Sequence, residues 1–286
     1  MNSIGKVNAV TELDPPIMNP DFPPMLHLLQ IPSGDSQLVG RMYSPQGSGS
    51  HPLVILLHGF PGSQFNHDMA AYLQELGYHA LVFHYRGAWG STGEFSIVHA
   101  LEDVRTVLAY LRQTDIIEKY HIDTGRIALV GHSFGGFLGL MTAANDPSIA
   151  ACASISGANY GAIGTKLSDP GMINRYEEAY EYAARFLTGY TSQKLASEVL
   201  EHFEQWNLAD CAPKLAACPV LLIGAGQDAV LPAAEHHVPL VQAFEQLDRA
   251  EFRHLLFEEA GHGYEGKRKS LCHAIGEWLA QVIETE

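Results

Sequence analysis

Short apolar segments alternate with helix-like segments along most of this chain. Runs such as LVILL at 53–57 and PVLLIG at 219–224 are hydrophobic at consecutive positions, so both faces of each expected strand must be buried. One helical stripe between such runs comprises Ile97, Leu101, Val104, Leu108 and Leu111. This alternation predicts an α/β fold, in which a mostly parallel sheet is covered by helices on both faces.

The strand-like runs cover residues 26–31, 37–43, 53–57, 79–83, 127–130, 150–155, 219–224 and 251–257. The turn-like sequence PSGDS joins the first two runs and predicts that the sheet begins with an antiparallel pair. A second helical stripe near the C-terminus comprises Leu271, Ile275, Trp278, Leu279 and Val282. The 286 residues therefore suit one large α/β domain, or one such domain with an insertion.

Two regions interrupt the alternation. Residues 1–24 contain five prolines, which predict an extended N-terminal arm. Residues 160–213 show no strand pattern, and NRYEEAYEYAARFLTGY and SQKLASEVLEHFEQW predict two helices there. We interpret 160–213 as a helical cap inserted over the ligand-binding edge of a core formed by 25–159 and 214–286. Extra helices on one flank, without contact to substrate, are the alternative.

A hydroxyl, a carboxylate and an imidazole each follow an expected strand, at the sheet edge where α/β proteins bind ligands. Ser133 lies in GHSFG, Asp228 ends AGQD, and His262 lies in EEAGHG. A serine hydroxyl becomes nucleophilic when a base takes its proton, and histidine is a suitable base near neutral pH. A carboxylate then orients the imidazole and stabilises its transient charge. Ser133, His262 and Asp228 are therefore the predicted catalytic residues.

The glycines around Ser133 fit a nucleophile elbow, G-x-S-x-G, in which the serine occupies a strained turn from strand to helix. Gly131 and Gly135 flank it because strand and helix approach too closely there for a Cβ atom. Preorganised N–H donors must stabilise the tetrahedral oxyanion. The backbone N–H groups of Phe134, which follows the serine, and of Phe60, in HGFPG, are the predicted donors.

Together these motifs resemble the α/β-hydrolase superfamily, over a region from about residue 25 to residue 283. The order of serine, acid and histidine matches that family, and HGFPG resembles its oxyanion loop in the HGxxG form. YRGAWGSTG at 85–93 resembles the Arg-Gly-x-Gly segment of esterase- and peptidase-like members. The resemblance implies an eight-stranded, mostly parallel sheet with antiparallel first strands, helices on both faces, and a cap between strands six and seven.

The residues and the resemblance together predict a carboxylesterase-like serine hydrolase that cleaves a small-molecule ester through an acyl-enzyme. Trp89 and Tyr160 are the predicted substrate-binding residues. Peptidase, amidase, thioesterase and lactonase activities use the same catalytic groups and stay open. A non-catalytic binding protein of this fold usually lacks the nucleophile or the histidine, and both are present here. A dehalogenase or epoxide hydrolase would need Asp at position 133.

Other polar residues near these motifs are interpreted as structural. His58 and His132 suggest packing or orientation, and Arg86 suggests a structural ion pair. The cluster at 235–237 (Glu-His-His) is expected on a solvated helix start. Asp169 is the first carboxylate after the strand at 150–155, but its place beside a proline in the expected cap suits a catalytic acid poorly.

Charge and composition argue against several classes of protein. The formal net charge of −15 argues against a nucleic-acid partner. No apolar run approaches the ~18 residues of a membrane span, and the first twenty residues lack the pattern of a secretory signal. No HExxH or paired-cysteine spacing predicts a metal site, and GAWGSTG lacks the GK[ST] ending of a phosphate loop. We therefore expect no metal and no cofactor.

Four cysteines lie among alanines and leucines, without metal-type spacing. They are interpreted as buried thiols in a reducing compartment, which predicts a cytoplasmic protein. The sequence leaves a homo-oligomer open.

Overall fold

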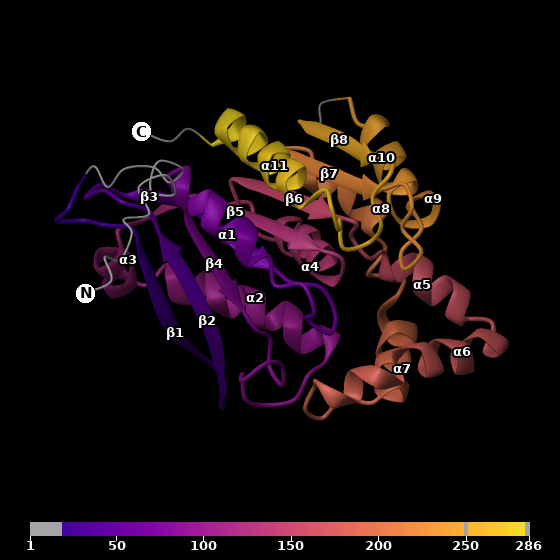
Figure 1. Ribbon diagram of the computed structural model, residues 1–286. Coiled ribbons are helices and arrows are strands. Elements are labelled where there is room, and N and C mark those ends of the chain that lie inside the picture. The colour runs from indigo at the N-terminus through magenta and orange to yellow at the C-terminus, as the bar shows by residue number, and fades with distance from the viewer. Residues whose placement is uncertain (1–18, 249–250, 284–286) are drawn as a thin grey trace, which may run out of the picture.

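The computed structural model of the protein describes residues 19–248 and 251–283. Within them lies an eight-stranded sheet with the strand order β1-β2-β4-β3-β5-β6-β7-β8 (Figure 1). The strands are β1 Met25–Ser33, β2 Ser36–Ser44, β3 His51–Leu57, β4 His79–Phe83, β5 Ile122–His132, β6 Ala151–Ile155, β7 Val220–Ala225 and β8 Phe252–Phe257. β2 pairs antiparallel with β1 and β4, and all other pairs are parallel. The α/β-hydrolase fold and its antiparallel start are confirmed.

Consecutive apolar residues in the strands serve two separate cores. Along β3, Leu53, Ile55 and Leu57 pack into one hydrophobic cluster, while Val54 and Leu56 pack into the other. Because side chains alternate between the faces of a strand, a strand buried on both faces must be apolar throughout. The sheet is therefore a middle layer between two layers of helices.

Helices outside the insertion cover both faces of the sheet. They are α1 His67–Glu75, α2 Ile97–Leu111, α3 Thr114–Tyr120, α4 Phe134–Ala143, α9 Ala233–His236, α10 Val238–Glu245 and α11 Arg268–Val282. α1 and α11 supply buried residues to one core, and α2, α4 and α10 supply them to the other (Figure 1). Both predicted stripes lie in helices, α2 and α11. Gly77, at φ +92°, follows α1.

Between β6 and β7 the chain forms an inserted segment of helices, residues 160–213. Its helices are α5 Tyr160–Leu167, α6 Pro170–Tyr180, the 3₁₀ helix η1 Glu181–Arg185, α7 Ser192–His202 and α8 Leu208–Cys211, and a second 3₁₀ helix, η2 Ala212–Leu215, runs past its end. Figure 1 shows α5, α6 and α7 grouped on one side of the sheet, away from both termini. The absence of strands in this segment is confirmed.

The first helix expected in this segment, at 174–190, is shorter than predicted and begins earlier. Asp169 caps α6 by accepting a hydrogen bond from the Gly171 N–H at 2.9 Å, so the helix starts at Pro170. At its other end the Tyr190 hydroxyl donates to the Tyr180 carbonyl at 3.0 Å, where the chain narrows into η1. Gly189 at φ +71° then turns the chain toward α7.

Backbone hydrogen bonds join the inserted segment to the loop after β4. The Thr188 N–H donates to the Gly87 carbonyl at 2.8 Å, and the Thr188 carbonyl accepts from the Phe95 N–H at 2.9 Å. The Glu198 carboxylate in α7 accepts hydrogen bonds at 2.8 and 2.9 Å from the first two N–H groups of α2. A carboxylate at this position satisfies unpaired donors and complements the helix dipole. The insertion is therefore held against the core at two places.

Three other expectations concern the N-terminus, the cysteines and membrane spans. Most of the expected arm, residues 1–18, lies outside the described residues, and residues 19–24 contain no helix or strand. All four cysteines are free thiols; Cys218 is half-buried and the other three are buried. No helix in the described ranges combines the length and apolar character that crossing a membrane requires.

Candidate active site

Ser133 occupies a strained turn between β5 and α4. Its backbone has φ 58° and ψ −117°, a conformation that residues with side chains rarely adopt. A Cβ atom on Gly131 would lie 2.0 Å from the Gly135 carbonyl oxygen, and one on Gly135 would lie 2.0 Å from the Leu57 carbonyl oxygen. Both contacts are far too short, so the two positions require glycine. The turn has the geometry of a nucleophile elbow.

The structure brings Ser133, His262 and Asp228 into one hydrogen-bonded series. The His262 Nε2 atom lies 2.9 Å from the Ser133 Oγ atom, and the His262 Nδ1 atom lies 2.7 Å from the Asp228 Oδ2 atom. The serine follows β5, the carboxylate follows β7 and the imidazole follows β8. Parallel strands place all three residues at the same edge of the sheet.

Asp228 is fixed by backbone groups on the side away from His262. Its Oδ1 atom accepts hydrogen bonds from the Val230 N–H at 2.9 Å and from the Leu231 N–H at 2.8 Å. Burial by itself would raise the pKa of Asp228, but the hydrogen bonds from His262, Leu231 and Val230 hold that pKa below its ordinary value. The side chain is therefore a carboxylate at neutral pH, and its second oxygen faces the imidazole.

His132 and His58 are buried beside the site and do not belong to the hydrogen-bonded series. The His132 Nε2 atom donates to the His262 carbonyl oxygen at 2.8 Å, and the His58 Nδ1 atom donates to the Gly59 carbonyl oxygen at 2.8 Å. Burial, with His262 nearby, lowers the pKa of His132 to about 4, and burial lowers the pKa of His58 to about 3. Both rings are neutral and hold the backbone next to Ser133.

The HGFPG loop runs alongside the elbow. A Cβ atom on Gly59 would lie 3.1 Å from the Ser133 Cβ atom, and the Phe60 ring makes an edge contact with Phe134 at a centroid distance of 6.4 Å. No group in the described part of the chain accepts a hydrogen bond from the N–H of Phe60 or Phe134. The Phe134 N–H belongs to the first turn of α4, where helices leave donors unpaired. Neither predicted donor is therefore occupied by another group of the described chain.

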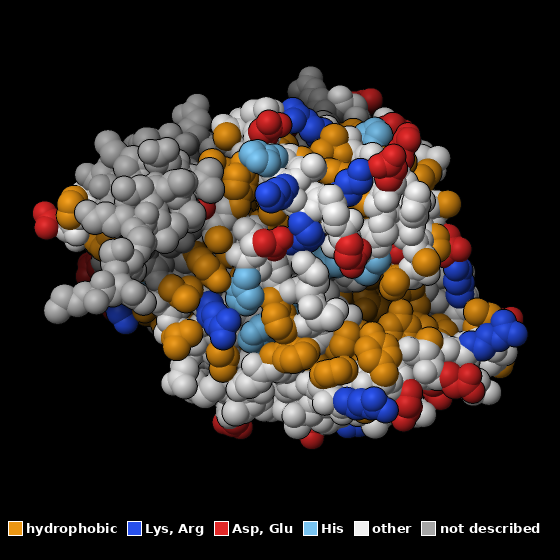
Figure 2. Space-filling model, in the orientation of Figure 1, with side chains coloured by type: hydrophobic (Ala, Val, Ile, Leu, Met, Phe, Trp, Pro, Cys, Tyr) orange, Lys and Arg blue, Asp and Glu red, His pale blue; other side chains and the backbone are white. Residues whose placement is uncertain are grey.

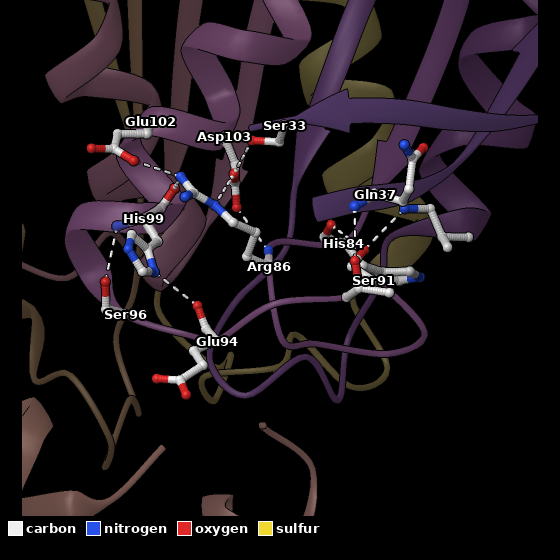
Figure 3. Close-up of polar contacts among 12 residues, drawn as sticks. Ser33, Gln37, His84, Arg86, Ser91, Glu94, Ser96, His99, Glu102 and Asp103 are labelled. Carbon is white, nitrogen blue, oxygen red and sulfur yellow. Dashed lines mark hydrogen bonds and ion pairs between the residues drawn. The ribbon is translucent and has the colours of Figure 1, made fainter. Parts of the chain in front are cut away.

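A buried ion pair fixes the loop after β4, which runs from residue 84 to residue 95. The Arg86 Nε atom lies 2.6 Å from Asp103 Oδ1, the Arg86 N–H donates to Asp103 Oδ2 at 2.7 Å, and the guanidinium contacts Glu102 at 2.6 Å. The Ser33 hydroxyl donates to Asp103 at 2.9 Å (Figure 3). These contacts fix the loop against α2, as expected of a structural ion pair.

Trp89 and Tyr160, the predicted substrate-binding residues, lie at different depths. Trp89 is 38% exposed, donates from Nε1 to the Pro61 carbonyl at 2.7 Å, and stacks on Phe186 of the insertion at 5.5 Å between centroids. Tyr160 is buried, with its ring centroid 4.8 Å from that of Phe137 and 6.0 Å from that of Phe134. Trp89 therefore borders the HGFPG loop from outside, and Tyr160 packs against Phe134 from inside.

A cavity of about 290 Å³ lies between helices α5 and α6 and the segment 230–236. Its walls are mainly apolar and include Ile163, Leu167, Met172, Tyr176, Tyr180 and Leu231. Figure 2 shows hydrophobic side chains gathered along a hollow between the inserted helices and the core. Trp89 and Tyr160 do not line this cavity.

One wall of the cavity is bonded to the hydrogen-bonded series, and another wall contacts the HGFPG loop. The Tyr180 ring lies 5.8 Å from the ring of Phe60, a residue of the HGFPG loop. Leu231, in the opposite wall, donates its N–H to Asp228. Val230 and Leu231 were not predicted as site residues from the sequence. Their place shortly after Asp228, at the same sheet edge, was the available signal.

His236 also lines the cavity, and here one expectation was wrong. Residues 235–237 were expected on a solvated helix start. They lie at the end of the short helix α9, directly before α10, and His236 is buried. The helix packs beneath the inserted segment, where the Asn159 N–H donates to the His236 Nδ1 atom at 3.1 Å. Glu235, at the cavity rim, forms an ion pair with Lys166 of α5.

In the described ranges, no group of three or more His, Cys, Asp or Glu side chains is arranged to hold a metal ion. His58, His67 and His84 lie near one another but contact mainly aromatic rings.

Residues 54–266 match the model of the alpha/beta hydrolase family. Quorum-quenching protein AidA of Acinetobacter baumannii is 33% identical over 133 residues, which are 44% of this chain and 42% of AidA. The chain thus spans less than half the length of that relative.

Two solved structures share the fold over most of this chain. Est1E from Butyrivibrio proteoclasticus has a TM-score of 0.67 at 19% identity, covering 90% of this chain and 99% of Est1E. The acylaminoacyl peptidase of Pyrococcus horikoshii has a TM-score of 0.68 at 17% identity, covering 92% of this chain and 42% of the peptidase. At this level of identity the likeness concerns the fold alone.

Proposed function

The chain belongs to the alpha/beta hydrolase family, and on this premise we propose that it is a serine hydrolase that cleaves carboxylic esters through an acyl-enzyme. One observation carries the proposal. Ser133 Oγ, the two nitrogens of His262 and Asp228 Oδ2 form a continuous series with separations of 2.9 and 2.7 Å. Serine, general base and orienting carboxylate are the three groups that nucleophilic acyl transfer requires.

In the acylation step, the Ser133 Oγ atom attacks the ester carbonyl carbon while His262 Nε2 takes the hydroxyl proton. Asp228 keeps the proton of neutral His262 on Nδ1, which leaves Nε2 free to act as the base. The carbonyl oxygen becomes an oxyanion that accepts hydrogen bonds from the N–H groups of Phe60 and Phe134. Removing one such donor from comparable enzymes costs about 3–4 kcal/mol of transition-state stabilisation.

Collapse of the tetrahedral intermediate breaks the ester bond, and His262 gives its proton to the departing alcohol oxygen. A water molecule then enters, loses a proton to His262 and attacks the acyl group on Ser133. The second intermediate collapses with return of that proton to the Ser133 oxygen and release of the carboxylic acid. Every step uses groups of the chain and water.

The cavity supports an ester in preference to a substrate with a free amino terminus. Recognition of an ammonium group by charge calls for an unpaired carboxylate. Glu235 is the carboxylate in the cavity wall, and it is already paired with Lys166. An amide or an acylated peptide, which carries no ammonium group, is the second candidate. The fold shared with the Pyrococcus horikoshii acylaminoacyl peptidase favours testing it.

We also propose that residues 160–213 act as a cap, because α5 and α6 form one wall of the cavity beside the site. A flank of helices without contact to substrate is the competing interpretation. The cytoplasmic location and the absence of a nucleic-acid partner remain predictions from the sequence. The formation of a homo-oligomer remains open.

A fluorophosphonate probe tests the assignment of the nucleophile. We expect one adduct per chain, located on Ser133 by peptide mapping and absent from the Ser133→Ala variant. Labelling of another serine, or labelling that survives the substitution, would contradict the proposal. EDTA should leave activity unchanged, because every proposed step uses protein groups. A chelator-sensitive enzyme would contradict the proposed steps.

The bond that is cleaved can be identified with two substrate series on the same preparation. One series comprises p-nitrophenyl esters of graded acyl length, and the other comprises aminoacyl- and acylaminoacyl-p-nitroanilides. We expect turnover of the esters and much slower turnover of the anilides. Comparable kcat/KM values for an acylaminoacyl anilide would favour the second candidate.

A further inference from the structure

His236 is a buried polar side chain in the wall of an otherwise mainly apolar cavity. It is 6% exposed, and it lies among wall residues such as Leu167, Val230 and Leu231. The proposed mechanism does not use it. A polar group that is buried without a complete set of hydrogen bonds carries an energetic cost, so its second nitrogen calls for an explanation.

The contact with Asn159 determines which nitrogen of His236 carries the proton. A backbone N–H can only donate, so the Nδ1 atom that receives it at 3.1 Å must be the unprotonated nitrogen. Burial lowers the pKa of His236 to about 4, so the ring is neutral near pH 7 and carries one proton. That proton is on Nε2.

His236 lines the cavity, and its Nε2–H group keeps some accessible surface. It has no hydrogen-bond partner among the described residues, and it is not sealed within the protein as the Nε2 atoms of His58 and His79 are. The tyrosine hydroxyls in the same wall can donate or accept, so they place no firm demand on a ligand. Lys166 and Glu235 are satisfied by each other at the rim. Arg175, which also lines the cavity and can only donate, is exposed, so solvent can satisfy its guanidinium. The Nε2–H group of His236, in contrast to the tyrosine hydroxyls, can only donate.

We propose that His236 determines substrate specificity by donating its Nε2–H to an oxygen on the substrate chain that occupies the cavity. The substrate is then an ester whose acyl or alcohol chain is mainly hydrocarbon and carries one acceptor, such as an ether, keto or hydroxyl oxygen. This inference rests on the proposed function, because it concerns the substrate of the same site. A purely hydrocarbon chain would leave the donor buried and unpaired.

Two substitutions separate the two nitrogens of the ring. In His236→Asn the amide oxygen can take the place of Nδ1 and accept from Asn159, while no donor remains at the position of Nε2. In His236→Gln an amide N–H can reach the position of Nε2, while the acceptor for Asn159 is lost. His254→Asn, on the exposed side of β8, makes a matched control outside the cavity.

The measured quantity is the ratio of kcat/KM for an oxygen-containing ester to kcat/KM for its hydrocarbon analogue. One series keeps the p-nitrophenyl group and replaces successive methylenes of an octanoyl chain by an ether oxygen. The other keeps a butanoyl group and makes the same replacements in the alcohol chain. The series that responds identifies the part of the substrate that lies in the cavity. Using a ratio within each variant removes general effects on activity or folding yield.

We expect the wild-type ratio to peak at one oxygen position in one series. His236→Asn should lower that peak about three- to tenfold, the effect of one hydrogen bond, while His236→Gln and His254→Asn should retain most of it. A ratio without a peak, or one that is the same in His236→Asn, would overturn the inference while leaving ester hydrolysis intact. Failure of the wild type to hydrolyse any ester, with no labelling of Ser133, would overturn both the inference and the proposed function.

Discussion

The His132 Nε2 atom lies 2.8 Å from the backbone carbonyl oxygen of His262 and donates a hydrogen bond to it. The two rings are also in contact, with centroids 4.9 Å apart. The residue directly before the elbow serine thus holds the main chain of the proposed base. His132 is therefore a positioning residue, which acts on the reaction through His262.

Replacing His132 should lower the turnover number more than it changes substrate binding. His132→Leu removes the donor and leaves a buried carbonyl without a partner, so we expect kcat to fall about tenfold, with KM within about twofold. His132→Gln retains an N–H near the Nε2 position and should recover most of the rate. Steady-state kinetics on p-nitrophenyl butanoate gives both constants. Equal losses in the two variants, or a change confined to KM, would contradict this role.

The buried Arg86–Asp103 ion pair should contribute far more to stability than the more exposed Arg86–Glu102 ion pair. The Asp103 side chain has no exposed surface and accepts from the Arg86 side chain, the Arg86 N–H and Ser33, whereas the Glu102 side chain is 46% exposed. Asp103→Ala should lower the free energy of unfolding by about 3–5 kcal/mol, because it leaves the Arg86 Nε and backbone N–H groups and the Ser33 hydroxyl without their buried acceptor. Glu102→Ala should cost less than about 1 kcal/mol. Urea titration measures both, and similar losses would count against the prediction.

The buried histidines should make the protein unstable in mild acid. Burial lowers the pKa of His58 to about 3 and the pKa values of His79 and His84 to about 4, whereas an unfolded histidine titrates near about 6.5. Above pH 6.5 neither state binds these protons. As the pH falls from there toward 4, the unfolded state takes up protons that the folded state does not. The free energy of unfolding should therefore decrease across this window.

A single substitution isolates one histidine of this set. His84→Phe removes one proton-binding site and should reduce the slope of unfolding free energy against pH by up to about 1.4 kcal/mol per pH unit. Urea midpoints at pH 7.5, 6.5, 5.5 and 4.5 give the slopes. A wild-type midpoint that stays constant from pH 7.5 to 4.5 would contradict the expected coupling.

Aromatic residues of the insertion should differ in their effect on substrate range. Tyr180 lines the cavity and contacts Phe60, while Phe186 is 44% exposed and stacks on Trp89 outside it. Tyr180→Ala should enlarge the cavity and shift the preferred p-nitrophenyl ester toward longer acyl chains. Phe186→Ala should change the ranking of chain lengths less. If neither variant alters the ranking, the insertion is a structural flank, and its role as a cap is wrong.

Much of the fold could be predicted because the strands are apolar throughout and are separated by clear helical stripes. Each expected strand overlaps a strand of the sheet, although β5 runs from Ile122 to His132 and the sequence indicated only 127–130. The first five residues of β5, IDTGR, are mostly polar, so a hydrophobicity pattern does not identify them as a strand. The two ends of α6 were also not predicted, because the start depends on a side-chain cap and the end on a tertiary hydrogen bond.

The site was predictable where chemistry depends on order along the chain, and unpredictable where it depends on packing. Ser133, Asp228 and His262 each follow a strand, so the topology alone brings them to one edge. His236 follows no such rule. Its burial arises from α9 packing beneath a segment distant in sequence, and the hydrogen bond from Asn159 spans 77 residues. Contacts of that kind require the three-dimensional arrangement.

The identity of the catalytic acid offers the sharpest test of the site, because the two candidate carboxylates are placed so differently. Asp228 accepts hydrogen bonds from His262 at 2.7 Å and from the N–H groups of Val230 and Leu231. Asp169 is exposed at the start of α6, where it accepts from the Gly171 N–H. Asp228 is hydrogen-bonded to the imidazole of His262, whereas Asp169 caps a helix.

Asp228→Asn should therefore keep the fold and lower kcat by about 10³–10⁴, because an amide cannot stabilise the imidazolium and favours the wrong tautomer of His262. Asp169→Asn should change kcat by less than about twofold, since asparagine caps helices as well as aspartate does. Kinetics of both variants on one activated ester gives the ranking, and far-UV circular dichroism checks the fold. The reverse ranking would move the acid to the inserted segment and overturn the assignment of Asp228.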